Sequence, residues 1–300
     1  YIGKALQDAG INSANIIDTL FISPLLFPTN PYHSLLKDDK LQSEDTNNPL
    51  NDSIKAKDLF FDEVATFKQT DETLREIYFL LLNDQKEFQS FFKFIDYQCA
   101  KTDIERLIRQ KFKHQICEQV SFDKEILENP IELAYCLSLI NSFVHYKKIH
   151  SITPPWVLKN YPEVERIMFR LRNKPCVSGC DYCNKVLDAK KGLKRFFGFD
   201  AYRKYGEEPL QEKAVKAAIA NKSILAVFPT GGGKSICFQV PALMKDGICL
   251  VISPLVALMK DQVANLQARN IKAIALTGGI RSEEMIDLLD NCQFGNYKFL

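Results

Sequence analysis

The sequence predicts an α/β fold at its C-terminal end, with a parallel sheet beside a phosphate-binding loop, preceded by a mainly α-helical region. Three consecutive glycines run directly into Lys234 and Ser235, between an apolar run of strand composition at 223–228 and a segment with helical spacing. A second apolar run, 248–253, is also followed by a segment with helical spacing. Strands that alternate with helices in this way indicate a parallel sheet.

The composition is that of a soluble globular chain with about two domains. Of its 300 residues, 46% are hydrophobic and 25% are charged, and the formal net charge is only +2. Whole-chain charge therefore does not by itself indicate a nucleic-acid partner. No stretch approaches the roughly 18 apolar residues of a membrane helix, and the nine cysteines show no pattern of a secreted disulfide framework. We therefore predict a cytoplasmic location.

The region before the glycines divides by composition. Polar residues are dense over 39–53, which predicts a loop. From about 54 to 150 helices are predicted to dominate, and prolines within 151–156 predict a boundary. The apolar residues at helical spacing are Leu74, Ile77, Tyr78, Leu81, Phe88, Phe91, Phe92 and Ile95.

Cys176, Cys180 and Cys183 form a Cys-x3-Cys-x2-Cys pattern with three possible meanings. The pattern also occurs in radical S-adenosylmethionine enzymes, where it holds an iron–sulfur cluster. That chemistry needs a following run of βα units, whereas here a phosphate-binding loop follows at 229–235. A structural Zn²⁺ is favoured over an iron–sulfur cluster and over free thiols, and it requires four N or S ligands. Spacing leaves the fourth ligand open, and the candidates are Cys117, Cys136 and His150.

The glycine-rich turn is predicted to bind a nucleoside triphosphate. Glycine lacks a Cβ, so the loop can adopt positive φ and turn its N–H groups inward, while the next helix adds unpaired donors and a positive dipole end. Lys234 would reach the β and γ phosphates, and Ser235 would ligate Mg²⁺. Phe228 stands where the strict Gly-x4-Gly-Lys-Ser pattern has its first glycine. The predicted cradle residues are Thr230, Gly231, Gly232 and Gly233.

A second helix is predicted to begin after the apolar run 248–253. Ser253 is a good N-cap and Pro254 fits the first helical position, while Lys260 points away from the apolar face. The helix start would face the carboxyl ends of the strands, where open parallel sheets place ligands. A capped core helix with no ligand is the alternative. The apolar face consists of Leu255, Leu258, Met259, Val263 and Leu266.

These motifs resemble those of a known family. Residues 229–239 and 251–263 look like motifs I and Ia of RecQ-type superfamily 2 DNA helicases, and 197–203 with Gln211 look like that family's adenine-recognition motif. The resemblance covers roughly 195–300 and implies a RecA-like domain that couples ATP and Mg²⁺ to 3′ to 5′ DNA strand separation. The segment between Arg203 and Gln211 is longer than is usual in the family.

The resemblance also implies roles for individual residues. Tyr202, Arg203 and Gln211 would hold the adenine base. Ser253, Pro254 and Lys260 would contact the phosphates of single-stranded DNA or a tailed duplex. Lysines and arginines between 185 and 204 form either a solvated face or a further DNA contact.

Two parts of such an enzyme are not found in 1–300, namely the acidic Asp-Glu-x-His motif and a second RecA-like domain with an arginine finger. We therefore expect an internal fragment that binds ATP and Mg²⁺ but hydrolyses almost none. The alternative is a nucleotide-binding regulatory or scaffold protein without unwinding activity.

The N-terminal portion is similar to the C-terminal half of a DEDDh exonuclease domain, which implies a small ribonuclease H-like fragment. That family holds two metal ions with four carboxylates and uses a histidine as general base. Asp52 matches the last carboxylate, but Asn47 stands at the place of the histidine, and an amide cannot take a proton near neutral pH. We expect an inactive fragment or, alternatively, a helical extension. The predicted organisation is 1–70 exonuclease-like, 71–170 helical connector, 171–194 cysteine knuckle and basic linker, and 195–300 the first part of RecA-like domain 1.

Overall fold

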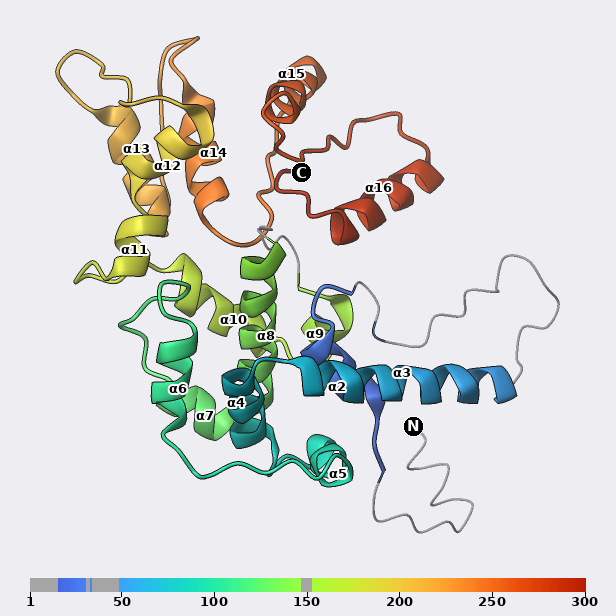
Figure 1. Ribbon diagram of the computed structural model, residues 1–300. Helices are drawn as coiled ribbons and strands as arrows, with labels where there is room; N and C mark the ends of the chain where they lie inside the picture. The colour runs from blue at the N-terminus through green and yellow to red at the C-terminus, as the bar shows by residue number, and fades with distance from the viewer. Residues whose placement is uncertain (1–15, 31–32, 34–48, 147–152) are drawn as a thin grey trace. The chain divides into compact units, whose positions relative to one another are not determined.

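The computed structural model describes residues 16–30, 33, 49–146 and 153–300, and the chain divides into two compact units (Figure 1). The first unit draws on 1–111, 122–139 and 154–164. The second draws on 112–121, 140–153 and 165–300. The chain thus passes between the units several times before it reaches the glycine-rich loop.

Helices make up the first unit where it is described. Leu74, Ile77, Tyr78 and Leu81 are all buried, which confirms the helical spacing seen in the sequence. The Asp71 side chain begins their helix, because its carboxylate accepts a hydrogen bond from the Leu74 backbone N–H at 3.2 Å. The helices are α2 (Thr19–Leu26), α3 (Pro49–Gln69), α4 (Glu72–Leu82), α5 (Lys86–Phe94), α6 (Ile104–Lys111), α7 (Asp123–Glu128), the first part of α8 (Pro130–Tyr146), and α9 (Pro155–Asn160).

Aromatic rings form much of this unit's core. Phe67 packs edge-on against Phe91 and Phe92, with ring centroids 5.6 Å and 5.8 Å away. Each such ring, fully buried, contributes roughly 1.5–3 kcal/mol of transfer free energy. The aromatic stripe of α5 is therefore a packing feature.

The second unit carries the glycine-rich loop. Asp188 begins α12 by accepting from the Lys191 backbone N–H at 2.8 Å, and Gly198 ends it in the left-handed conformation with φ 73°. Helix α14 packs against both α12 and α13. The elements are the second part of α8, most of α10 (Glu163–Met168), the π-helical turn η2 (Phe169–Asn173), α11 (Asp181–Val186), α12 (Ala189–Phe197), α13 (Leu210–Ile219), α14 (Lys234–Met244), α15 (Val256–Gln267) and α16 (Ser282–Phe294).

The predicted parallel sheet is not confirmed: the described residues form isolated bridges and no regular strand. In the described part of the chain, extended segments pair through two parallel bridges, Cys249 with Phe299 and Ala273 with Phe299. The segment around Phe299 therefore lies between the other two, and backbone bonds such as that from the Cys249 N–H to the Lys298 carbonyl, 2.9 Å, join them. The segment at 297–300 is thus paired on both sides.

The run at 223–228 does not pair as predicted. No β-bridge joins it to other described residues, and Leu225 and Val227 are 91% and 81% exposed. In the run at 248–253, Cys249 and Val251 pack against the core while Ile252 is 99% exposed, so only one face is covered. A strand of a parallel sheet is usually covered on both faces, and these two runs lack that cover.

Two predicted boundaries also differ. Helix α15 begins at Val256, with Leu255 rather than Ser253 at the N-cap. Ser253 instead accepts a hydrogen bond from the Leu255 N–H, 3.4 Å away, and forms a local turn that competes with the helix. Residues 49–53, expected in a loop, form the first turn of α3, while 39–48 lie outside the described residues.

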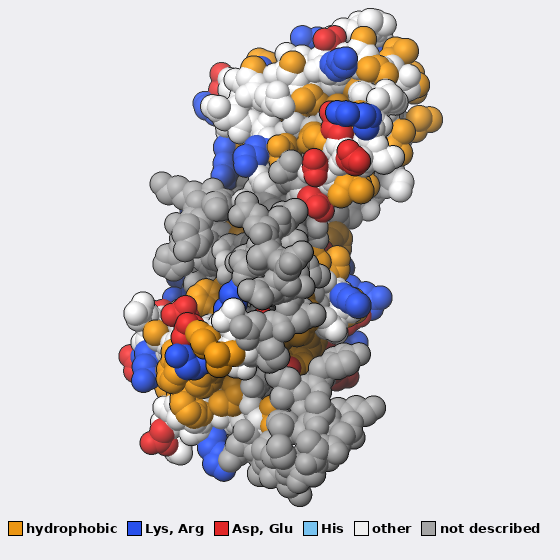
Figure 2. Space-filling model, turned by 90° about the vertical axis from the view of Figure 1, so that its right-hand side faces the viewer, with side chains coloured by type: hydrophobic (Ala, Val, Ile, Leu, Met, Phe, Trp, Pro, Cys, Tyr) orange, Lys and Arg blue, Asp and Glu red, His pale blue; other side chains and the backbone are white. Residues whose placement is uncertain are grey.

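The apolar face predicted for α15 is only partly buried. Leu266 is buried, but Leu255 and Leu258 are 62% and 44% exposed. Figure 2 shows hydrophobic side chains at the surface among charged ones at the end that holds α15 and α16. Nowhere in the described ranges is a helix both long enough and apolar enough to span a bilayer.

Candidate nucleotide-binding site

The glycine-rich loop has the backbone conformation that the sequence predicted. Gly231 and Gly233 have φ of 76° and 72°, in the region that favours glycine. A Cβ on Gly232 would lie 2.8 Å from the Pro229 carbonyl oxygen, and a Cβ on Gly233 would lie 2.6 Å from Gln211 Nε2. Close contacts with the backbone therefore require glycine at 232, whereas at 233 the backbone angle requires it and the Gln211 side chain adds a close contact.

Three side chains hold the loop carbonyls on one side. Arg203 Nη1 donates to the Gly231 carbonyl at 2.6 Å, the Tyr205 hydroxyl donates to the Gly232 carbonyl, and Gln211 Nε2 donates to the Gly233 carbonyl at 2.9 Å. In a trans peptide, the C=O of one residue and the N–H of the next residue point in opposite directions.

Several loop N–H groups therefore remain available. Within the described residues, the backbone N–H groups of Gly231, Gly233, Lys234 and Ser235 donate to no protein acceptor. Lys234 and Ser235 also stand in the first turn of α14, where N–H groups have no intrahelical partner. These donors and the positive end of the helix dipole make a site for an anion.

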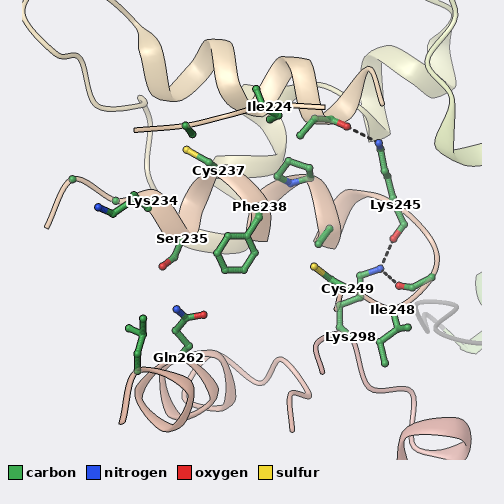
Figure 3. A pocket seen from close by; sticks show the side chains of 18 of the residues that line it. Ile224, Lys234, Ser235, Cys237, Phe238, Lys245, Ile248, Cys249, Gln262 and Lys298 are labelled. Carbon is green, nitrogen blue, oxygen red and sulfur yellow. Dashed lines mark hydrogen bonds between the residues drawn. The ribbon is translucent and has the colours of Figure 1, made fainter. Parts of the chain in front are cut away.

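A cavity of about 1100 Å³ lies beside the loop (Figure 3). Its wall runs along the loop and the exposed side of α14, and includes Gln262 of α15 and Lys298. Ser235 and Gln262 point toward one another across it in Figure 3. Lys234 Nζ donates to the Phe228 carbonyl at 2.7 Å, so the amine lies against its own loop. The volume and donors suit a nucleoside triphosphate.

The residues expected to hold adenine lie in different surroundings. Gln211 is buried, and its amide bonds the loop through Nε2 and the Arg203 backbone N–H through Oε1, 2.9 Å away. Tyr202 is in the core, where its hydroxyl donates to the Ala189 carbonyl at 2.6 Å, and it does not line the cavity. The structure thus joins Gln211 and Arg203 to the loop and places Tyr202 behind it.

Tyr205 is a site residue that the sequence did not single out. Its ring stacks on Phe228, with centroids 4.8 Å apart and planes at 21°, while its hydroxyl reaches the loop. Phe228, which stands at the place of the first glycine in the strict pattern, thus packs against the residue that bonds the loop. The signal available in the sequence was an aromatic residue within the unusually long segment between Arg203 and Gln211.

Two buried amines close the other end of the cavity. Burial lowers the pKa of Lys245 to about 8, and its Nζ donates to the Ala218 carbonyl at 2.8 Å. Burial also lowers the pKa of Lys298 to about 8, and its Nζ donates to the Lys245 and Gly247 carbonyls. Lys245 thus ties the end of α14 to α13, and Lys298 ties it to the paired segment at 297–300. Carbonyl partners lessen the penalty of burying a charge.

The residues expected to contact DNA lie at the start of α15. Pro254 and Lys260 are exposed and Ser253 is half-buried. Because the helix begins at Val256, the unpaired N–H groups of its first turn belong to residues 256–258. Ser253 and these N–H groups remain close in sequence, but Ser253 does not cap the helix.

The cysteine pattern gains a fourth member. The Sγ atoms of Cys117, Cys176, Cys180 and Cys183 all lie within 4.8 Å of one another. Of the other candidates, Cys136 is buried in α8 outside this group, and His150 lies outside the described residues.

The exonuclease-like prediction remains largely untested. Asp52 is exposed in the first turn of α3 and belongs to neither group of possible metal ligands among the described residues. Asn47 lies outside those residues.

Comparison with known proteins matches the C-terminal part of the chain to helicases. A family model of DEAD/DEAH box helicases matches residues 208–295. The ATP-dependent DNA helicase RecQ of Haemophilus influenzae is 43% identical over 108 residues, which are 36% of this chain and 17% of the relative. RecQ of Synechocystis is 43% identical over 100 residues, covering 33% and 20%. The probable ATP-dependent DNA helicase RecS of Bacillus subtilis is 40% identical over 109 residues, covering 36% and 21%.

The glycine loop and the helix α14 that follows it lie within the segment that matches the DEAD/DEAH box helicase model. The relatives narrow the likeness: over about 100 residues, the C-terminal part of this chain is similar to ATP-dependent DNA helicases of RecQ type. The chain spans 17–21% of the length of these three relatives.

Proposed function

We propose that this chain is part of an ATP-dependent DNA helicase of RecQ type, and that residues 203–235 form its ATP–Mg²⁺ site. The observation that carries the proposal is the fixing of three consecutive loop carbonyls by Arg203, Tyr205 and Gln211. Fixed carbonyls leave the opposite N–H groups in place before a ligand arrives, which lowers the cost of ordering the loop on binding.

Individual residues then have defined roles. The N–H groups of Gly233, Lys234 and Ser235 would hold phosphate oxygens, and the Lys234 amine, which donates to the Phe228 carbonyl, would contact the β and γ phosphates. The Ser235 hydroxyl would ligate Mg²⁺. ATP, when bound, would supply the phosphoryl transfer that drives strand separation. Gln211 and Arg203 link the base side of the site to the loop, so that occupancy by adenine steadies the phosphate cradle.

DNA binding is assigned to the start of α15. Ser253, the free N–H groups of 256–258 and Lys260 contact backbone phosphates, which positions a strand without reading its sequence. By resemblance, translocation runs 3′ to 5′. Residues 1–300 contain no Asp-Glu-x-His sequence, so this stretch alone binds ATP but hydrolyses almost none.

The test compares Lys234→Ala with wild type in two settings. In the 300-residue chain, titration calorimetry should show weaker ATP–Mg²⁺ binding for the variant, with Lys222→Ala, an exposed lysine outside the loop, as the matched control. In the whole protein, the ATPase should depend on single-stranded DNA, and Lys234→Ala should abolish unwinding while DNA binding largely persists. Equal ATP affinities would refute the site, and an ATPase indifferent to DNA would favour the regulatory alternative.

A further inference from the structure

Four cysteine sulfurs gather outside the nucleotide-binding loop, and one of them comes from a segment far upstream of the Cys-x3-Cys-x2-Cys pattern. Cys180 Sγ lies 3.9 Å from Cys117 Sγ, although the two residues are 63 positions apart. Four sulfurs at about 2.3 Å from one Zn²⁺ stand about 3.8 Å from each other in a tetrahedron. The four thiols thus have the spacing of a single-ion site before any ion is added.

Backbone groups support the sulfurs. The Cys180 N–H points to Cys176 Sγ at 3.2 Å, and the Cys176 N–H points to Cys183 Sγ at 3.5 Å. Donors aimed at sulfur stabilise the thiolate, which is the form that binds a metal. The turn between the first two cysteines is set by Gly179, whose φ is 71° and whose carbonyl accepts from Asn184 Nδ2 at 2.5 Å.

The distant cysteine is held by independent contacts. The Cys117 N–H donates to the Leu171 carbonyl at 2.8 Å, and Arg172 Nη1 donates to the Gln115 carbonyl at 2.7 Å. Cys117, Cys180 and Cys183 are 2%, 8% and 5% exposed, so the segment presents its sulfur to the knuckle within a closed site. This fit does not depend on the cysteine spacing that first suggested a metal.

We propose that Cys117, Cys176, Cys180 and Cys183 bind one structural Zn²⁺, which ties the segment 112–121 to the knuckle beneath the nucleotide-binding segment. A polynuclear iron–sulfur cluster carries its cysteines on different irons and spreads the sulfurs further apart than one ion does. The described sulfurs, all within 4.8 Å of each other, fit the single ion.

The cysteine site packs into the same hydrophobic cluster as α14, the helix that follows the phosphate-binding loop. The buried cysteines share one hydrophobic cluster with Leu193 of α12 and with Val240 and Met244 of α14. At Gly192 the two helices approach so closely that a Cβ would lie 2.3 Å from Met244 Sδ. Metal binding by the folded state alone therefore stabilises the platform on which α14 rests.

The test measures metal in the whole 300-residue chain. Purified protein should carry about one equivalent of zinc, and X-ray absorption at the zinc edge should give four sulfur neighbours at about 2.3 Å. Cys117→Ser should weaken zinc binding by more than about 100-fold, since loss of a direct ligand exceeds the effect of an outer-shell change. Cys99→Ser, a half-buried cysteine outside the group, should leave the metal content unchanged.

An exposed neighbouring group provides a second control. His114, Glu118 and Asp181 also lie within 4.8 Å of one another, so His114→Ala tells whether bound metal resides there instead. If Cys117→Ser does not fold, the sulfur count in the wild type still decides. Three sulfur neighbours, iron in place of zinc, a Cys117–Cys180 disulfide, or zinc lost on His114→Ala would each overturn the proposal.

Discussion

Breaking the ion pair between Arg172 and Asp246 should destabilise the second unit strongly. Their side chains are only 15% and 7% exposed, and Arg172 Nη2 donates to Asp246 Oδ1 at 3.3 Å beside a closer contact from Nε. Arg172 also lies over the Tyr182 ring, 5.7 Å from its centroid. Arg172→Met leaves the Asp246 carboxylate buried without its cation, so we expect a loss of about 3 kcal/mol, the low end for a buried pair broken on one side.

A double-mutant cycle separates the pair from its surroundings. Asp246→Asn should cost a similar amount, because it strands the guanidinium. The double variant should cost less than the sum of the two, by about 1.5 kcal/mol or more. Stability is read from urea-dependent hydrogen exchange of the α14 amides, which reports the second unit by itself.

An exposed pair in the same unit is the control. Lys194 and Asp200 are 2.9 Å apart but 72% and 83% exposed, so Lys194→Met should produce no measurable change. Additive effects of Arg172→Met and Asp246→Asn, or a Lys194→Met effect of equal size, would show that the burial of the pair is not what matters.

The remaining predictions concern the loop and the buried amines. Gly233 and Gly198 both have left-handed φ, so Gly233→Ala and Gly198→Ala should each lose about 1–2 kcal/mol of stability. Only Gly233→Ala, whose Cβ would meet Gln211, should weaken ATP binding in calorimetry. Equal affinities would exclude an effect of the contact with Gln211. Burial lowers the folded-state pKa of Lys298 and of Lys245 to about 8, while an unfolded lysine titrates near 10.4. At these two amines the unfolded chain therefore binds more protons between these values, and their contribution to stability should rise with pH from about 8 to about 10. Lys298→Met should remove about half of that rise, because the pKa of Lys245 is lowered to the same degree, whereas Lys222→Met should leave it intact; an unchanged slope in Lys298→Met would contradict this assignment.

Part of the candidate site could be predicted from the sequence, because it depends on residues that are neighbours in the chain. Positive φ at Gly231 and Gly233 follows from the absence of a Cβ, and the helix after Lys234 follows from apolar spacing. The same holds for the stripe of α4, where each predicted apolar residue is buried. These features depend on residues within a few positions of each other.

The features that could not be predicted from the sequence depend on contacts between residues far apart in the chain. Arg172 and Asp246 are 74 positions apart, and nothing in their flanking residues marks them as a pair. Cys117 was one of three candidates until the fold brought it to the knuckle. Tyr205 lies in the long segment between Arg203 and Gln211, and only the fold shows that its ring stacks on Phe228. The predicted start of α15 was too early, because the Ser253 hydroxyl accepts a hydrogen bond within a local turn and does not cap the helix.

The interleaving of the two units bears on how the ATP-binding segment can be isolated. The second unit includes 112–121 and 140–153 as well as 165–300. Excision at residue 195, where resemblance to helicases begins, would discard Arg172 and Cys117 and uncover the apolar side of α14 that α12 protects. The helical stretch upstream is thus no mere spacer, and a truncated chain that keeps its solubility should begin before Phe112.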